Sequence, residues 1–180
     1  NPPSVAPGVD APADITINAS ALYTPISLRQ LLSLATGTSA ADIDSALAQL
    51  ARDNTDGAGC CSARPQGLVN GDRILLRPGR HEVIWTATNK AGVSGSDVQV
   101  VNVRPLVSFS KNQVTTKGNT APVRIILNGP SPFYPLQVPY VIDPSSTAVA
   151  GDHNVTSGVA TFVEGQTEVT LNATFNSQGT

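Results

Sequence analysis

Little in this sequence carries the chemistry of a catalytic centre. Among 180 residues there are no methionines, two cysteines, two histidines and one tryptophan, and aromatic residues make up 4%. No HExxH, GxSxG, P-loop or GxGxxG pattern occurs, and glutamate is found only at Glu82, Glu164 and Glu168, so a glycosidase pair would need a chance meeting of sparse carboxylates. These absences argue against zinc hydrolases, serine hydrolases, nucleotide-binding enzymes and glycosidases. We therefore expect no enzymatic activity, and His81 and His153 are not expected to share a site.

Charge and long apolar runs are also scarce. Charged residues make up 13% of the chain, the formal net charge is −2 and the sequence pI is about 5.5. Without a basic face to hold phosphates, we expect no nucleic-acid binding. No apolar run approaches the roughly 20 residues of a membrane-spanning helix, so we expect no direct membrane insertion. The absence of methionine and the start at Asn1-Pro2-Pro3 indicate a mature or excised piece of a longer chain.

What the sequence does contain is a succession of strand patterns separated by turns. In the stretch 82–88, Val83, Trp85 and Ala87 share one face of the predicted strand, which predicts that they point inward and that Trp85 anchors a core. The last pattern, 168–175, alternates most regularly and predicts a half-buried antiparallel strand. Strands at roughly ten-residue spacing favour β-sandwiches. The predicted strands are 14–19, 73–76, 82–88, 97–103, 106–109, 123–128, 138–142, 158–163 and 168–175.

One helix interrupts this series, at residues 39–53. Ser39 and Asp42 have the spacing of a capping box, and an apolar residue recurs at helical spacing from Ile43 to Leu50. We expect this helix to cover the edge of a sandwich.

The step from Arg104 to Pro105 predicts a domain boundary. Pro105 cannot donate a hydrogen bond to a sheet, and it directly follows a predicted strand. We therefore predict two domains, 1–104 and 105–180. The connection between them is short and stiffened by proline, which predicts a semi-rigid arrangement.

The first half resembles the hyalin-repeat (HYR) module, an immunoglobulin-like sandwich. The matching stretches are ARDNTDG at 51–57 with a cysteine after it, RPGRHEVIWTATNKAG at 77–92, and SDVQVVNV at 96–103. Trp85 stands where the family has its second cysteine, so the family's inter-strand disulfide cannot form. Asn89 and Val93 replace the usual Asp and Asn, and the helix reads as an insertion.

The second half resembles the Calx-β module, another immunoglobulin-like sandwich. The match is VPYVIDPSSTAVAGDHNVTSGVATFVEGQTEVTLNATF at 138–175, in which His153 replaces the aromatic residue of the family's turn. The family's acidic segment and final strand should follow Phe175, so we expect a module truncated at its C-terminus. Together the resemblances imply a mainly β chain with two immunoglobulin-like β-sandwich domains in tandem and one short helix inserted in the first.

Calcium is the one cofactor that the sequence suggests. Asp53 and Asp56 lie within a four-residue stretch of oxygen-bearing side chains, the ligands that calcium prefers, with Asp10 and Asp14 as further candidates. The alternative is that Asp53 and Asn54 end the helix and shape the next turn through bonds to the backbone. In the second module the local acids are sparse: Asp143, Asp152 and Glu164.

The adjacent cysteines Cys60 and Cys61 leave three alternatives open. They form a vicinal disulfide, remain reduced, or bridge to another chain. Two cysteines alone cannot complete a four-ligand metal site. In an oxidising compartment disulfides are expected, so we predict the vicinal bridge, with a structural role.

These observations predict a non-catalytic spacer segment of a multi-domain extracellular or cell-surface protein, with a possible role in cell adhesion. The HYR and Calx-β resemblances imply a bacterial source and neighbouring domains of the same chain as partners. The alternatives are a calcium-dependent or glycan-binding adhesion module, which would contact a surface protein or glycan, and an accessory region of a secreted enzyme. For sugar stacking the candidates are Trp85, Tyr134 and Tyr140.

Overall fold

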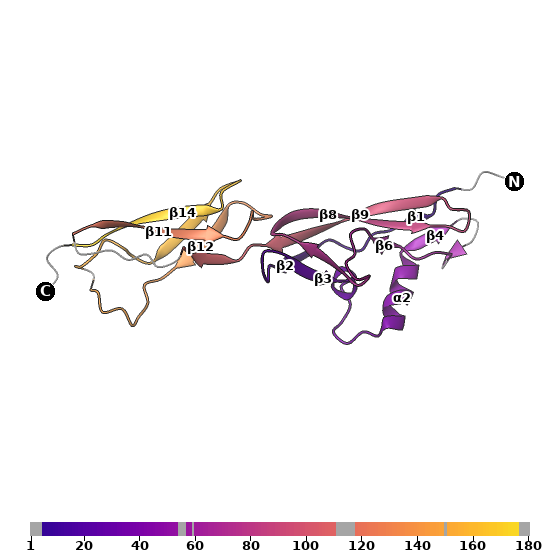
Figure 1. Ribbon diagram of the computed structural model, residues 1–180, viewed down its shortest axis with the longest axis horizontal. Coiled ribbons are helices and arrows are strands. Elements are labelled where there is room, and N and C mark those ends of the chain that lie inside the picture. The colour runs from indigo at the N-terminus through magenta and orange to yellow at the C-terminus, as the bar shows by residue number, and fades with distance from the viewer. Residues whose placement is uncertain (1–4, 54–56, 59, 111–117, 150, 177–180) are drawn as a thin grey trace. The chain divides into compact units, whose positions relative to one another are not determined.

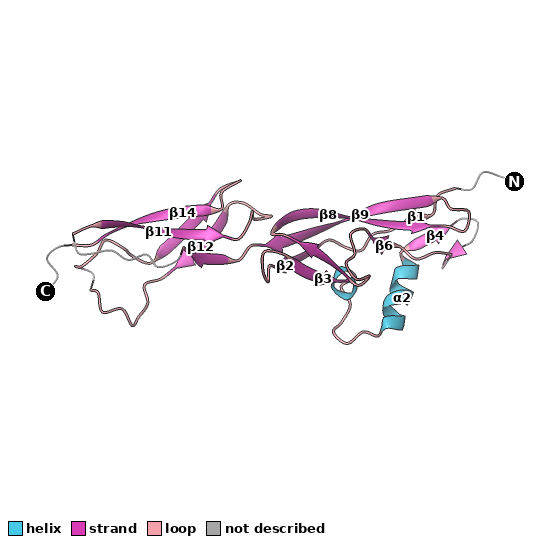
Figure 2. Cartoon of the chain, viewed as in Figure 1, coloured by secondary structure: helices cyan, strands magenta, loops and turns pink. Residues whose placement is uncertain are grey.

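The computed structural model describes residues 5–53, 57–58, 60–110, 118–149 and 151–176, and the chain is mainly β (Figures 1 and 2). The mainly β class predicted from the strand patterns is thereby confirmed. The chain divides into two compact units, Asn1–Arg104 and Pro105–Thr180, and each has its own hydrophobic cluster.

The described residues of the first unit form three sheets. The four-stranded sheet has the order β2-β9-β8-β6, with β2 parallel to β9 and the other pairs antiparallel. Its strands are β2 (Ile15–Asn18), β9 (Ser94–Arg104), β8 (Gly79–Thr88) and β6 (Arg64–Pro65). The smaller sheets are β1-β4-β5, formed by Gly8–Val9, Ala51–Asp53 and Gly57–Ala58, and β3-β7, formed by Thr24–Ser27 and Arg73–Leu76.

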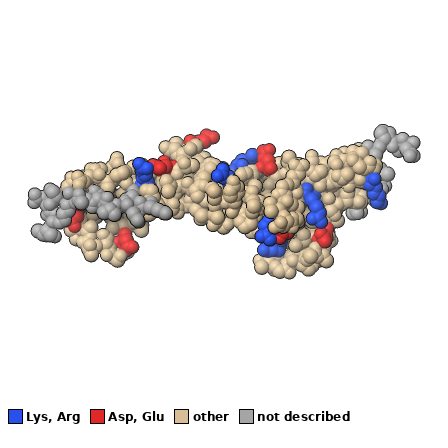
Figure 3. All heavy atoms as spheres, in the orientation of Figure 1, with Lys and Arg blue, Asp and Glu red and all other residues tan. Residues whose placement is uncertain are grey.

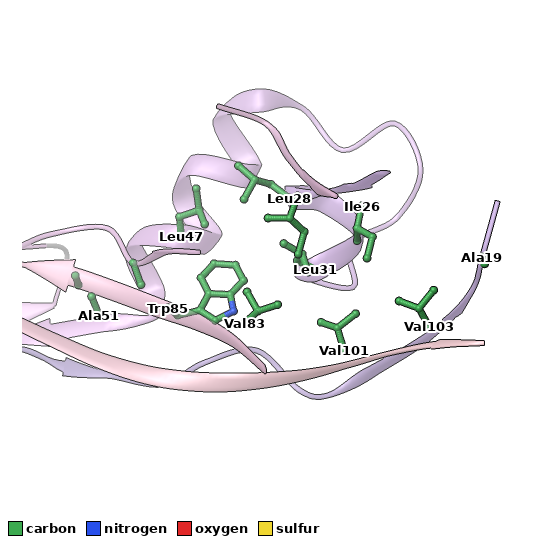
Figure 4. Packing of buried hydrophobic residues seen from close by; sticks show 13 residues of the cluster. Ala19, Ile26, Leu28, Leu31, Leu47, Ala51, Val83, Trp85, Val101 and Val103 are labelled. Carbon is green, nitrogen blue, oxygen red and sulfur yellow. The ribbon is translucent and has the colours of Figure 1, made fainter. Parts of the chain in front are cut away.

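The core of the first unit lies on one face of the four-stranded sheet. Val83, Trp85 and Ala87 on β8 are buried, as the alternating pattern predicts, and Trp85 is fully buried. Figure 4 shows the Trp85 side chain between the sheet and the apolar side chains of the helices, among them Leu47 and Leu31. Burial of large apolar side chains is the dominant stabilising term in such a core.

The predicted helix forms but ends early. α2 (Ala40–Gln49) follows Ser39, whose Oγ accepts a hydrogen bond from the backbone N–H of Asp42 at 3.2 Å. Its apolar stripe buries Leu47. The prediction that the helix continues to residue 53 is wrong, because Ala51–Asp53 form strand β4. Ala51 is fully buried and pairs with Val9 of β1, so these residues join a sheet instead of forming a further helical turn.

A second helix was missed. α1 (Leu28–Leu31) is a single turn with a complete capping box, in which Ser27 and Gln30 bond reciprocally. Leu28 and Leu31, the first and last residues of this turn, are buried. The prediction of one helix is therefore wrong, although the Ser27-x-x-Gln30 spacing is a capping signature in the sequence. Neither helix is long and apolar enough to cross a membrane, in the part of the chain that the structure describes.

In the second unit, the part of the chain that the structure describes forms two sheets. The three-stranded sheet has the order β10-β11-β14, all antiparallel, and β12 pairs antiparallel with β13. Ile125, Leu127, Ala160 and Phe162 form the buried core between them. The predicted alternation of the last strand is confirmed, because Val169 and Leu171 are half-buried and Ala173 is buried. The strands are β10 (Val107–Phe109), β11 (Thr120–Leu127), β12 (Leu136–Tyr140), β13 (Gly158–Phe162) and β14 (Glu168–Thr174).

Candidate functional site

Asp53, a predicted calcium ligand, is engaged by a side chain from a distant turn. Its carboxylate is buried, and Oδ2 accepts a hydrogen bond from Asn89 Nδ2 at 2.8 Å. The same amide nitrogen donates to the carbonyl of Val5 at 3.0 Å, and Asn89 Oδ1 accepts from the backbone N–H groups of Ala91 and Val93. Two of the three stretches that carry the HYR resemblance, 51–57 and 77–92, thus meet through a buried Asp53–Asn89 contact that ties β4 to the turn after β8.

The calcium prediction is not decided by this contact. Asp56 lies outside the described residues. Among the residues that the structure does describe, no three side chains of His, Cys, Asp or Glu are grouped so that they could hold a metal ion. Asp14 accepts from the backbone N–H of Val100, and in the second unit Asp143 and Asp152 accept from the N–H groups of Ser145 and Val149. These carboxylates shape turns and strand contacts, and calcium stays a prediction.

The other predicted site residues are placed apart. Cys60 and Cys61 are half-buried, and Cys61 packs against the first core. Their positions do not test the vicinal disulfide, which stays a prediction. His81 belongs to the first unit, where Nε2 lies 2.7 Å from the carbonyl of Arg77. His153 belongs to the second unit and lies edge-on to Phe175 with ring centroids 6.3 Å apart.

The aromatic residues considered for sugar stacking serve the two cores. Trp85 is fully buried and donates from Nε1 to Gln99 Oε1 at 3.1 Å. Tyr134 and Tyr140 pack against the core of the second unit. The buried Trp85 has no face left for a sugar ring, and the proposal of a glycan site draws no support from it.

An open groove of about 510 Å³ lies between α1, α2 and the turn before β7. Its charges are mixed, since Arg64 Nη2 lies 3.5 Å from Asp44 Oδ1 and Asp72 pairs with Arg73 at 2.9 Å. On the face drawn in Figure 3, charged side chains are likewise scattered over a mostly uncharged surface. The groove therefore favours neither an anionic nor a cationic ligand.

The most extensive polar arrangement in the first unit is a parallel seam between residues 11–18 and residues 97–104. Its second half is the β2–β9 ladder, which pairs Ile15 with Val101 and Asn18 with Arg104. Its first half is made by side chains: Ala11 N–H donates to Asp97 Oδ2 at 2.8 Å, Gln99 Nε2 donates to the carbonyl of Ala13 at 2.7 Å, and Val100 N–H donates to Asp14 Oδ1 at 2.8 Å. Every one of these pairs is separated by 86 residues, so one register runs along the whole seam.

Gln99 is the buried centre of the seam. Its side chain is fully buried, accepts from Trp85 and donates to the carbonyls of Ala13 and Leu31. It therefore connects β9 to β8, to α1 and to the N-terminal segment. Sequence reasoning missed this role, although a glutamine on the inward side of a strand, in step with Val101 and Val103, is a signal for a buried polar hub.

Three exposed carboxylates, those of Asp72, Asp97 and Asp143, have lowered pKa values. The backbone N–H groups of Ala11 and Val98 hold the pKa of Asp97 below its ordinary value of 3.8. The hydroxyl and backbone N–H of Ser145 lower the pKa of Asp143, and the Arg73 guanidinium lowers that of Asp72. Each donor favours the ionised carboxylate, so all three stay charged at neutral pH.

The link between the two units is one residue long, because the residues on both sides of Pro105 are hydrogen-bonded within their own unit. The carbonyl of Arg104 accepts from the N–H of Ala19 at 2.8 Å inside the first unit. Inside the second unit, the Leu106 N–H donates to Asn128 Oδ1 at 2.7 Å, and the Leu106 carbonyl accepts from the Asn128 N–H at 3.1 Å. Pro105 alone lies between these anchored residues.

Comparison with known proteins adds no relative: neither a family model, nor a curated protein, nor a solved structure matches this chain. The HYR and Calx-β resemblances therefore stay predictions from sequence.

Proposed function

We propose that this chain is a non-catalytic spacer segment of a multi-domain extracellular or cell-surface protein, in which two immunoglobulin-like sandwiches in tandem separate neighbouring domains. The observation that carries this proposal is the junction, where Arg104 and Leu106 are each bonded within their own unit. A linker of one residue, with φ restricted by the proline ring, leaves few ways to reorient one unit against the other.

Other observations support the same proposal. The sparse charge and the threonine-, serine- and valine-rich composition suit an extracellular β protein. The HYR and Calx-β resemblances point to large bacterial surface or secreted proteins, whose neighbouring domains would be the partners. No catalytic step is part of this proposal.

The test of the spacer role is rotational motion, measured by ¹⁵N NMR relaxation. We expect the amides of both units to report one shared correlation time, because the junction transmits rotation. A Gly-Ser-Gly-Ser insertion after Pro105 should replace it with two shorter correlation times. The matched control places the same insertion after Gly37, in the exposed turn before α2, and should leave the shared correlation time unchanged. Two independent correlation times in the unmodified chain would contradict the proposal.

Thermal melting separates the spacer from a calcium-dependent adhesion module. A calcium ion that binds only the native state raises the melting temperature by mass action. The spacer proposal expects equal melting temperatures in calcium and in chelator, whereas a rise of several degrees in calcium would favour the adhesion module.

A further inference from the structure

The geometry points to a mechanical role for the first unit: the parallel seam of residues 11–18 and 97–104 is a clamp that resists tension along the chain. This goes beyond the spacer role, because a spacer can keep domains apart without resisting force. The inference rests on three features of the seam, namely the direction of its two strands, the bonds along it and the apolar side chains beneath it.

The direction of the strands determines how tension acts. Because residues 11–18 run parallel to β9, the chain enters the seam at Ala11 at one end, and the chain after Arg104 leaves it at the other. Tension from the N-terminus reaches the seam through β1, which pairs with β4. Tension between the two chain ends therefore pulls the strands in opposite directions along their own length. In this shearing geometry all the bonds between the strands are loaded together, whereas in a peeling geometry they break one after another.

The bonds extend the seam well beyond the backbone ladder. The ladder itself covers Ile15–Asn18 against residues 101–104, and the N–H of Ala19 adds a bond to the Arg104 carbonyl. The acceptor carboxylates of Asp14 and Asp97 and the amide of Gln99 continue the same register toward the N-terminal end. Hydrogen bonds to an ionised group are stronger than neutral ones, so these side chains reinforce the end where the ladder stops.

One face of the seam is covered by the hydrophobic core of the first unit. Val101 and Val103 are fully buried, and Ile15 and Ile17 pack against the same cluster. Water reaches the ladder from one side only, which slows the exchange of a strand–strand bond for a bond to water. The seam therefore combines bonds that share the load with an apolar base that must also be uncovered.

The test is single-molecule stretching of the full chain with handles at its two ends. The first unit holds more residues and gives the longer extension step, so the two units are told apart in one trace. At a fixed force, Asp97→Ala and Asp14→Ala should each raise the rate of the longer step about tenfold, the loss expected for one hydrogen bond to a charged group. The matched control Asp10→Ala, an exposed acid in the same segment, should leave that rate unchanged.

A second pulling direction distinguishes resistance to shear along the seam from the general stability of the first unit. Ala91 is exposed in the turn between β8 and β9, at the same end of the seam as residue 11. A handle attached there through an azide-bearing residue, with the other at the N-terminus, peels the N-terminal segment away instead of shearing it. Only the first unit lies between these two handles, and we expect its unfolding step at a clearly lower force than in end-to-end pulling. Equal forces in the two directions, or an unchanged rate in both Asp97→Ala and Asp14→Ala, would overturn the clamp.

Discussion

At the scale of single residues, Gln99 of β9 joins three other parts of the first unit. It is fully buried and satisfies the indole N–H of Trp85 and the carbonyls of Ala13 and Leu31 at the same time. A buried polar side chain stabilises the fold only when its donors and acceptors are hydrogen-bonded. A buried group without a partner lowers the free energy of unfolding by the cost of removing that group from water.

Replacing Gln99 by leucine should therefore destabilise the first unit. We expect Gln99→Leu to lower the free energy of unfolding by about 3 kcal/mol, since one buried N–H and two carbonyls lose their partner. Urea denaturation followed by the fluorescence of Trp85, the single tryptophan, measures this. The control is Gln66→Leu, because the Gln66 side chain is exposed and its contact with Thr86 Oγ1 is a long 3.4 Å. Equal stabilities of Gln99→Leu and Gln66→Leu would contradict the assigned role.

The lowered pKa of Asp97 predicts how the stability of the first unit changes in acid. Its pKa is lowered in the folded chain, so its contribution to stability is present above the unfolded pKa and is lost as the pH falls through the lower folded pKa. We expect the urea midpoint, followed by Trp85 fluorescence, to fall between about pH 6 and about pH 3. Asp97→Asn keeps an acceptor oxygen but cannot titrate, so it should show a smaller fall, with Asp72 supplying part of the remainder. The same acid-induced fall in both proteins would show that Asp97 is not responsible.

At the scale of elements, β9 depends on a close approach of the N-terminal strand. A Cβ added to Gly95 would lie 1.9 Å from the carbonyl oxygen of Pro7, far inside any allowed contact. Gly95 therefore allows β1 to pass directly over the start of β9.

We expect Gly95→Ala to displace β1 and to lower the free energy of unfolding by about 2 kcal/mol, as overpacking does elsewhere. Hydrogen exchange of the Asp10 amide, which bonds to the carbonyl of Leu50, should become faster. Gly8→Ala is the matched control on β1 itself, because its added Cβ would meet the Arg52 carbonyl at an ordinary 3.7 Å. Unchanged exchange at Asp10 in Gly95→Ala would count against the close approach.

Element boundaries show where local patterns stop deciding structure. β7 (Arg73–Leu76) has the predicted bounds, because its strand pattern is closed by the turn that begins at Arg77. α2 ends four residues before its predicted end, since β1 takes the backbone of Ala51 and Arg52 into a sheet. The competing partner comes from a segment about forty residues earlier, which no window around the helix contains.

At the scale of the whole molecule, the two hydrophobic clusters predict independent unfolding. Phe162 is fully buried in the second core, whereas Trp85 lies in the first. Phe162→Ala should lower the stability of the second unit by about 3–5 kcal/mol, because it removes a buried aromatic ring.

Circular dichroism should show this loss as an earlier transition of the second unit, while the Trp85 fluorescence transition stays in place. Phe109→Ala is the matched control, since that ring is 58% exposed in the same unit. An equal shift of the Trp85 transition in Phe162→Ala would mean that the units unfold as one.

The candidate sites were only partly accessible to sequence reasoning. Asp53 was singled out as a calcium ligand, which stays a prediction, or as a residue that ends the helix, which is wrong because the helix ends at Gln49 and Asp53 lies on β4. Its partner Asn89 lies 36 residues away and was read only as a substitution in a motif. The seam was not predicted at all. Its side-chain bonds join residues 86 apart, and Asp14, Asp97 and Gln99 have no unusual spacing within their own strands.

The sequence by itself determined the strand alternation, the Ser39 helix start and the inward position of Trp85, because side-chain periodicity and capping act over a few residues. Only the tertiary structure decided that β2 runs parallel to β9, that Asn89 reaches Asp53 and that Gln99 joins three elements. Those choices depend on which distant surfaces can be buried together with their polar groups paired, and that is a property of the folded unit and of no local stretch of chain.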